Sequence, residues 1–193
     1  MLTIVEIEDQ KQHLELTRDI AQAFNSIYDK DVFPLPEPQI FGSATRVMSL
    51  RDGNAKMSKS ASSMAGVIEL LDSSDSIIKK FKSSVTDAGK EIKFDEQSKP
   101  GISNLLTIAS ALSGKTIKDL ENEYAGKGYG DFKLQVAEIA VEVINPIRIR
   151  TQELMADKAA LLQLLKNGAD KANQVASKTL ADVYTALGLI KNG

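Results

Sequence analysis

The chain has 193 residues, of which 42% are hydrophobic and 26% are charged, and its formal net charge is −2. This composition is ordinary for a globular protein and excludes collagen-like, mucin-like and wholly disordered chains. With no cysteine and a single histidine, the chain cannot form disulfides, thiolate or multi-histidine metal sites, or a cysteine nucleophile. No apolar run approaches the ~20 residues that cross a bilayer. The N-terminus lacks the basic region of a secretory signal, so we expect a cytoplasmic protein.

The beginning of the chain predicts a strand, a helix and an extended connection. Residues 2–7 are apolar and β-branched, which favours a strand. From Gln10 to Tyr28 apolar side chains recur at helical spacing. Residues 29–45 are rich in proline and predict an extended connection without helix. A strand followed at once by a helix is the start of an α/β unit, so we expect a piece of a larger sheet and hence a fragment.

The next segment predicts a short strand and a cationic loop. Residues 46–50 favour the strand, whereas residues 51–66 are rich in serine, glycine, alanine and lysine. So few bulky side chains cannot pack tightly, which predicts a mobile loop. Residues 46–60 carry four basic residues against one acidic residue, so this segment suits an anion.

The rest of the chain predicts an all-helical bundle over residues 75–193. Residues 85–100 are polar and favour a loop with a small hairpin around Ile92 and Phe94. Pro146 should kink or split a long helix. The expected helices begin at Asp75, cover 102–112 with Gly114 at the end, and continue over 116–124, 134–155 and 170–187.

Residues 56–60 read Lys-Met-Ser-Lys-Ser and are the best candidate for a chemical site. Two lysines three residues apart on a loop form an anion clamp, because the ammonium group suits phosphate oxygens. Backbone N–H groups and serine hydroxyls can add hydrogen bonds. An arbitrary lysine pair at this spacing is more often a solvated loop, so composition alone does not decide for a ligand.

The exact string KMSKS is the second signature of the class I aminoacyl-tRNA synthetases, and its surroundings are similar to the C-terminal part of bacterial tryptophanyl-tRNA synthetases. The resemblance runs from about Glu8 to the end of the chain. The segments that carry it are EDQKQHLELTRDIAQAFN, RVMSLRDGNAKMSKS, KPGISNLLTIASALSG, YAGKGYGDFK and ADKANQVASKTLADVYTALGL.

The resemblance implies a tryptophan–tRNA ligase, which activates L-tryptophan with ATP to the adenylate and transfers it to tRNA-Trp. It implies catalytic roles on the ATP phosphates for Lys56 and Lys59, with Mg²⁺ accompanying ATP and no protein metal site. Gln10 matches a glutamine beside tryptophan. The residues implied for ATP binding are Glu8 and Asp9 near the ribose, Val47 near adenine, and Lys56, Met57, Ser58, Lys59 and Ser60 in the loop.

The resemblance also implies a mainly α fold with two parts. Residues 1–66 would be the C-terminal remnant of a Rossmann-like α/β nucleotide-binding domain, and residues 67–193 an α-helical bundle that binds the tRNA anticodon. The family is homodimeric, and no membrane partner is implied.

Several positions depart from the family pattern. Ile7 replaces a glycine, Ala61 replaces a common aspartate, and residues 53–55 replace a common Pro-Thr-Lys-like turn. The first signature of class I synthetases is absent, so we expect one half of an active site and no tryptophan-dependent exchange by the chain alone. The alternatives are a helical module that binds tRNA or a partner, and a truncated non-functional gene product.

Other polar residues favour structural roles. We expect His13 to be solvated or structural, residues 125–130 to form a helix–helix turn, and the tyrosines Tyr124, Tyr129 and Tyr184 to pack. Asp119, Glu121 and Glu123 predict a solvated acidic face. The basic residues that could contact RNA backbone, with a solvated surface as the alternative, are Arg148, Arg150, Lys158, Lys166, Lys171 and Lys178.

Overall fold

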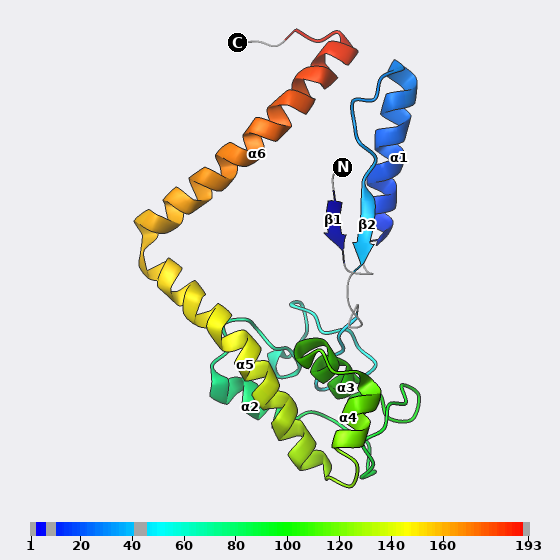
Figure 1. Ribbon diagram of the computed structural model, residues 1–193, viewed down its shortest axis with the longest axis vertical. Coiled ribbons are helices and arrows are strands. Elements are labelled where there is room, and N and C mark those ends of the chain that lie inside the picture. Colours follow the sequence, from blue (N-terminus) through cyan, green and yellow to red (C-terminus); the bar gives the residue numbers. More distant parts are fainter. Residues whose placement is uncertain (1–2, 7–10, 41–45, 191–193) are drawn as a thin grey trace. The chain divides into compact units, whose positions relative to one another are not determined.

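A computed structural model describes residues 3–6, 11–40 and 46–190. Within these residues the protein is mainly helical, as expected, with a two-stranded parallel sheet near the start of the chain (Figure 1). The chain divides into two compact units, one made of residues 1–41 and 154–193 and the other of residues 42–153.

The first unit begins with a β–α–β element. β1 (Thr3–Glu6) leads into α1 (Lys11–Tyr28), and β2 (Glu37–Ile40) then pairs in parallel with β1. Parallel strands need a crossover connection, and α1 supplies it. The predicted strand and helix are confirmed. The described part of the proline-rich connection, residues 29–40, contains no helix, as predicted, and Glu37–Ile40 form the second strand, which the sequence did not indicate.

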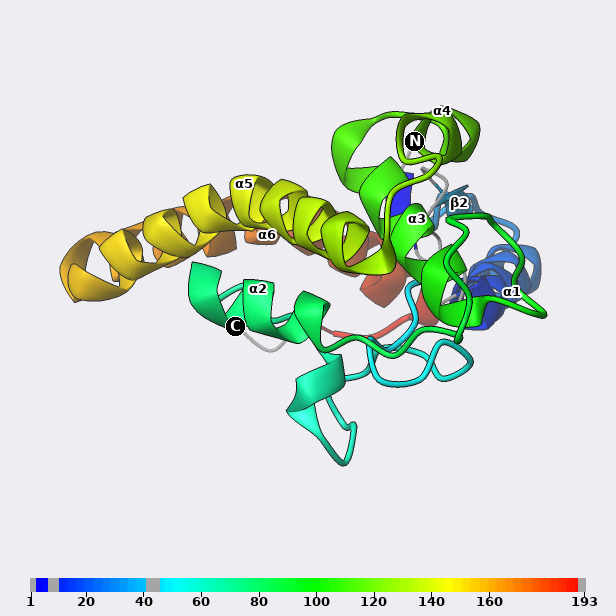
Figure 2. The same ribbon diagram turned by 90° about the horizontal axis from the view of Figure 1, so that it is seen from below.

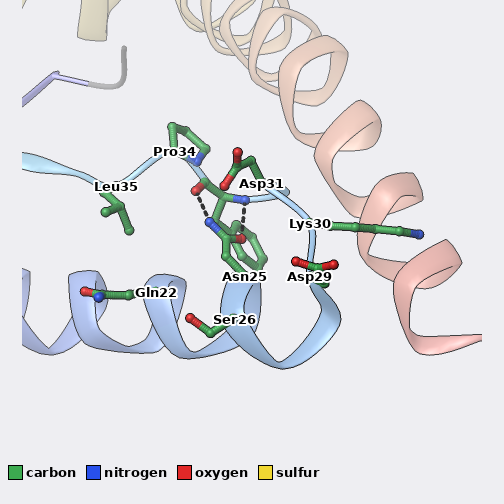
Figure 3. Close-up of a pocket in the computed structure, with 9 residues that line it drawn as sticks. Gln22, Asn25, Ser26, Asp29, Lys30, Asp31, Pro34 and Leu35 are labelled. Atoms are coloured by element: carbon green, nitrogen blue, oxygen red, sulfur yellow. Dashed lines mark hydrogen bonds between the residues drawn. The ribbon is translucent and has the colours of Figure 1, made fainter.

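The loop after α1 is organised by Asn25. Its Oδ1 accepts hydrogen bonds from the N–H groups of Val32 and Phe33 at 3.1 and 3.0 Å, and its Nδ2 donates to the Phe33 carbonyl at 2.8 Å. Figure 3 shows Asn25 in a hollow of about 670 Å³ whose wall comes from α1 and this loop. The loop turns back through Asp29, which adopts a positive φ of 47°.

The first unit also contains the last helix, α6 (Lys158–Leu187). The side chain of Asp157 caps its N-terminus by accepting from the Ala160 N–H, and Gly188 ends it with a φ of 67°. The predicted start at residue 170 is wrong by 12 residues, because Gly168 stays inside the helix rather than breaking it. α6 contains no buried residue.

The second unit is built from helices. η2 (Met64–Gly66) is a short 3₁₀ turn, and α2 (Ser74–Lys82), α3 (Pro100–Ser113), α4 (Ile117–Glu123) and α5 (Tyr129–Ala156) follow. Gly114 ends α3 with a φ of 73°, as predicted. The core lies between α2, α3, α4 and α5 and includes these buried apolar side chains: Ile77, Phe81, Ile102, Leu105, Leu106, Ala109, Leu120, Phe132, Val136, Ala137, Ala140 and Ile144.

Three local predictions for this unit need correction. Residues 46–50 form no regular strand; an isolated bridge joins Met48 to Lys56, and single backbone hydrogen bonds flank it. The hairpin around Ile92 and Phe94 is wrong, because this segment is irregular and the Phe94 N–H bonds to the Glu121 carboxylate at 2.7 Å instead of to a strand. α5 runs through Pro146 without splitting, so the split is wrong, whereas the kink stays a prediction.

Candidate functional site: the lysine-serine loop

The Lys-Met-Ser-Lys-Ser segment leaves the helical unit from a base held by backbone hydrogen bonds. The Leu50 N–H donates to the Gly66 carbonyl at 2.9 Å and closes the loop. Inside this closure the Met57 N–H donates to the Val47 carbonyl at 3.0 Å. The first lysine of the segment, Lys56, therefore has a defined backbone position, although few bulky side chains surround it.

A tight turn connects the two sides of the base. The Asn54 N–H donates to Asp52 Oδ1 at 2.9 Å, and the Ala55 N–H donates to the Asp52 carbonyl at 3.2 Å. Gly53 lies at its apex, where a Cβ atom would come within 2.7 Å of the Pro100 backbone at the start of α3. A glycine allows this approach of turn and helix.

The tip of the loop presents cations and hydroxyls together. Lys56, Lys59 and Ser60 are exposed, and Met57 and Ser58 are half-buried. The hydroxyls of Ser58 and Ser60 lie 2.9 Å apart, and the Ala61 N–H donates to the Ser58 carbonyl at 3.1 Å. This turn places Lys59 on the outside, and Lys59 takes part in no ion pair within the described residues.

Such an arrangement suits a multiply charged anion. The Lys59 ammonium group and the Ser60 hydroxyl lie on exposed residues, and Lys59 can exchange its hydration for phosphate oxygens without breaking an ion pair among the described residues. In the part of the chain that the structure describes, no group of three or more His, Cys, Asp or Glu side chains could hold a metal ion.

The far end of the loop is pinned to α2 by a buried ion pair. Lys80 Nζ donates to the Val67 carbonyl at 2.8 Å and to Asp72 Oδ2 at 2.6 Å, and both side chains are largely buried. Burial by itself raises the pKa of the Asp72 carboxyl. The hydrogen bonds from Lys80 and the Glu69 N–H, together with the Lys80 charge, outweigh burial and leave this pKa below its usual value.

The start of the loop is held by a residue whose role the sequence did not assign. Asn104 of α3 is 6% exposed, and its side chain makes two hydrogen bonds to the backbone of Met48. The available signal was an amide four residues before Ile108 in a helix rich in apolar residues, because a buried amide needs hydrogen-bond partners.

The implied site residues fall into two groups. Val47 is half-buried, packs against the core and bonds to Met57, so the structure brings it together with the loop that contains Lys56 and Lys59. Glu8, Asp9 and Gln10 lie outside the described residues. The ribose and tryptophan contacts implied for them therefore stay predictions.

Most of the residues weighed for other roles are structural. Tyr124 is buried against Phe132, with ring centroids 5.0 Å apart, and Gly126 gives the turn before α5 its positive φ of 77°. Tyr129 pins the loop after α2, since its hydroxyl donates to Asp87 and accepts from Lys99. The packing roles of Tyr124 and Tyr129 are confirmed, and the predicted turn is confirmed for residues 125–128, because residues 129–130 already belong to α5.

The acidic face has local partners. Glu121 accepts from the Phe94 N–H and pairs with Lys93 at 3.1 Å, and both contacts lower the pKa of its carboxyl. Glu123 pairs with Lys115 at 2.6 Å. The solvated acidic face that the sequence predicted is corrected for Glu121, which is largely buried, whereas Glu123 is exposed as predicted.

Most of the remaining candidates lie on exposed helical surfaces, whereas Arg148 of α5 is half-buried and donates to Asn145 Oδ1 at 2.7 Å. His13 is exposed on α1, and its carbonyl accepts from the Thr17 hydroxyl at 2.8 Å. Arg150 pairs with Glu153 one turn along α5, and Lys158, Lys166, Lys171 and Lys178 are exposed on α6. Among the described helices, none combines the length and apolar character needed to cross a membrane.

Comparison with known proteins gives the family. Residues 8–145 match the family described as tRNA synthetases class I (W and Y). The chain therefore belongs to this family of class I tRNA synthetases.

Individual relatives agree. A tryptophan–tRNA ligase from Bacillus anthracis is 50% identical over 182 residues, which are 94% of this chain and 55% of that protein. A tryptophanyl-tRNA synthetase from Mycoplasma pneumoniae superposes with a TM-score of 0.76 at 32% identity, covering 95% of this chain and 57% of the other. The enzyme from Campylobacter jejuni, solved with ADP and tryptophan, gives 0.66 at 30% identity and covers 97% and 57%. The chain spans about half the length of the relatives it matches.

Proposed function

We propose that this chain forms the phosphate-binding loop and the tRNA-binding part of a tryptophan–tRNA ligase. Such an enzyme couples L-tryptophan to AMP at the expense of ATP and then transfers the amino acid to tRNA-Trp. The observation that carries the proposal is the Lys56–Ser60 loop, whose two lysines are exposed at the tip of a backbone-closed base. Membership of the synthetase family and 50% identity to a tryptophan–tRNA ligase support it.

In this proposal Lys56 and Lys59 act on the ATP phosphates. The tryptophan carboxylate attacks the α-phosphorus, the bond to the β-phosphate oxygen breaks, and pyrophosphate leaves with the added negative charge. Two ammonium groups beside the β- and γ-phosphates stabilise that charge as it develops. A loop fixed at its base and exposed at its tip can close on the phosphates when ATP is bound.

The other residues have roles at the edges of this site. Ser58 and Ser60 add hydroxyl donors, and the Met57 and Val47 backbone lies beside them, with Val47 next to adenine. Glu8 and Asp9 bind the ribose, and Gln10 lies beside tryptophan. Mg²⁺ would accompany the ATP phosphates, as the family resemblance implies.

The proposal divides the chain by role. Residues 1–66 are the end of a Rossmann-like nucleotide-binding domain, which the parallel β1–α1–β2 element supports. Residues 67–193 are a helical tRNA-binding domain, with exposed basic residues on α5 and α6 as candidates for backbone contacts. A homodimer is proposed from the family resemblance.

Pyrophosphate exchange tests the proposal. The chain is assayed for tryptophan-dependent exchange between ATP and pyrophosphate, alone and mixed with the part of the Bacillus anthracis relative that it does not match. We expect exchange in the mixture. Lys56→Ala or Lys59→Ala should each lower it by about 10²–10³-fold, the usual effect of removing one charge-stabilising donor.

The matched control is Lys90→Ala, an exposed lysine outside the loop, which should leave exchange unchanged. No exchange in the mixture, or full exchange in both loop variants, would contradict the enzymatic role. If such a chain still slowed the electrophoretic migration of tRNA-Trp in a salt-dependent way, that result would favour a binding module instead.

A further inference from the structure

The base of the phosphate-binding loop is joined to the helical core by one buried amide. Asn104 Oδ1 accepts from the Met48 N–H at 2.9 Å, and Asn104 Nδ2 donates to the Met48 carbonyl at 2.8 Å. The two residues are 56 positions apart in the sequence. Both backbone groups of Met48 are therefore satisfied by a single side chain of α3.

This pairing differs from the other buried polar contacts of α3. The Ser103 hydroxyl accepts from the Asp95 N–H, and the Ser110 hydroxyl donates to the Lys115 carbonyl, so these two hold segments close to α3 in the sequence. Asn104 instead reaches the segment that leads into the loop. In Figures 1 and 2 this segment, drawn in cyan, lies beside α3.

Backbone contacts connect Met48 directly to the segment that carries the two lysines. Met48 forms an antiparallel bridge with Lys56, and the bonds between Ser49 and Ala55 at 2.8 Å and between Val47 and Met57 at 3.0 Å flank that bridge. Asn104 therefore binds the residue that forms the bridge with Lys56, and Lys59 follows three residues after Lys56.

The energetics favour a single geometry for this base. An amide buried to 6% exposure that makes both of its backbone hydrogen bonds holds one orientation, because any rotation would leave buried polar groups without partners. α3 contributes Ile102, Leu105 and Leu106 to the core, so the helix is a rigid support.

We propose that Asn104 is a positioning residue of the phosphate-binding loop: it fixes Met48 on α3 so that Lys56 and Lys59 extend from a base that moves with the helical unit. The inference rests on the proposed function for its catalytic consequence. It predicts that ATP affinity depends on a side chain that touches no phosphate.

Hydrogen exchange of the full chain tests the mechanical part of the proposal. In Asn104→Ala we expect the amides of Met48 and Met57 to exchange at least tenfold faster, while amides within α3 and α5 keep their protection. Thr107→Ala, one turn along the same helix, removes a hydroxyl that bonds only within the helix in the described structure and should leave the loop base unchanged.

Asn104→Asp separates a positioning role from a packing role. It keeps the shape and the acceptor for the Met48 N–H, but its second oxygen faces the Met48 carbonyl instead of donating to it, so it should loosen the loop base more than it disturbs the helices. If both variants lose protection evenly over α3 and α5, Asn104 is a core residue and the proposal is overturned. Unchanged Met48 and Met57 exchange in both variants also overturns it.

The pyrophosphate-exchange assay, run on the mixture with the missing part of the enzyme, measures the effect on catalysis. Asn104→Asp should raise the KM for ATP about tenfold and leave the KM for tryptophan within twofold, and an equal rise in both constants would overturn the proposal. If the mixture that contains the unaltered chain shows no pyrophosphate exchange, the proposed function fails. The hydrogen-exchange result then still decides whether Asn104 holds the loop base.

Discussion

Helices α3 and α6 show two different uses of the same local pattern. α3 is 14 residues long and buries eight of them, whereas α6 is 30 residues long and buries none. Both have apolar residues at helical spacing, and in α6 Leu180 and Leu187 remain 51% and 40% exposed. The periodic pattern therefore specifies a helix, and burial depends on which partners the fold brings to it.

The difference has a consequence for function. The lysine-serine loop belongs to the unit that contains α3, and its base is tied to α3 and α2 through Asn104 and Lys80. A rigid base helps a ligand-binding loop, because a displacement of the base would also displace the lysine side chains at the tip.

The largest expected effect is a difference in the free energy of unfolding between Leu→Ala substitutions in the two helices. Leu106→Ala in α3 removes a fully buried side chain and should cost about 3 kcal/mol or more, from lost transfer energy and the cavity left behind. Leu164→Ala in α6, where the side chain is 54% exposed, should cost about 0.5 kcal/mol or less. Urea unfolding followed by circular dichroism measures both, and equal costs would break the comparison.

A second effect, of intermediate size, is the pH dependence of the free energy of unfolding. The Asp72 carboxyl next to Lys80 has a lowered pKa in the folded chain, so the unfolded chain binds its proton more readily. Its contribution to stability is complete above the unfolded pKa of about 3.9 and is lost as pH falls through the lower folded pKa.

Urea midpoints measured between neutral pH and acid test this contribution. Asp72→Asn should flatten the acid part of the stability curve of the unit that contains α2 and α3. Asp95 and Glu121 also have pKa values lowered by hydrogen bonds from neighbouring groups, so part of the acid dependence should persist. Acid curves for Asp72→Asn and the original chain that run parallel would contradict the assigned role of the pair.

The smallest expected effect concerns the glycines of the two helices. Gly168 lies inside α6 with open space where a Cβ would be, so Gly168→Ala should stabilise this helix by about 0.5–1 kcal/mol. Gly114 at the end of α3 also has open space but a φ of 73°, so Gly114→Ala should destabilise by about 1 kcal/mol. Circular dichroism during thermal unfolding distinguishes the two signs, and the same sign for both would refute this explanation.

Much of the secondary structure was predictable because its signals are local. The strand at Thr3–Glu6, the helix that ends at Tyr28, and the glycine stop of α3 all follow from residues adjacent in the chain. The predictions that were wrong concerned competition between local and distant partners. Phe94 bonds to Glu121 rather than to a neighbouring strand, and Pro146 remains inside a helix whose other bonds hold it.

The loop that contains Lys56 and Lys59 followed from the sequence, because five adjacent residues carry its charge, its hydroxyls and its family signature. The tertiary structure decided what holds that loop in place. A hydrogen bond between Asn104 and Met48 joins residues far apart in the chain, and no local pattern can specify such a pair, since its geometry exists only after α3 has packed into the core.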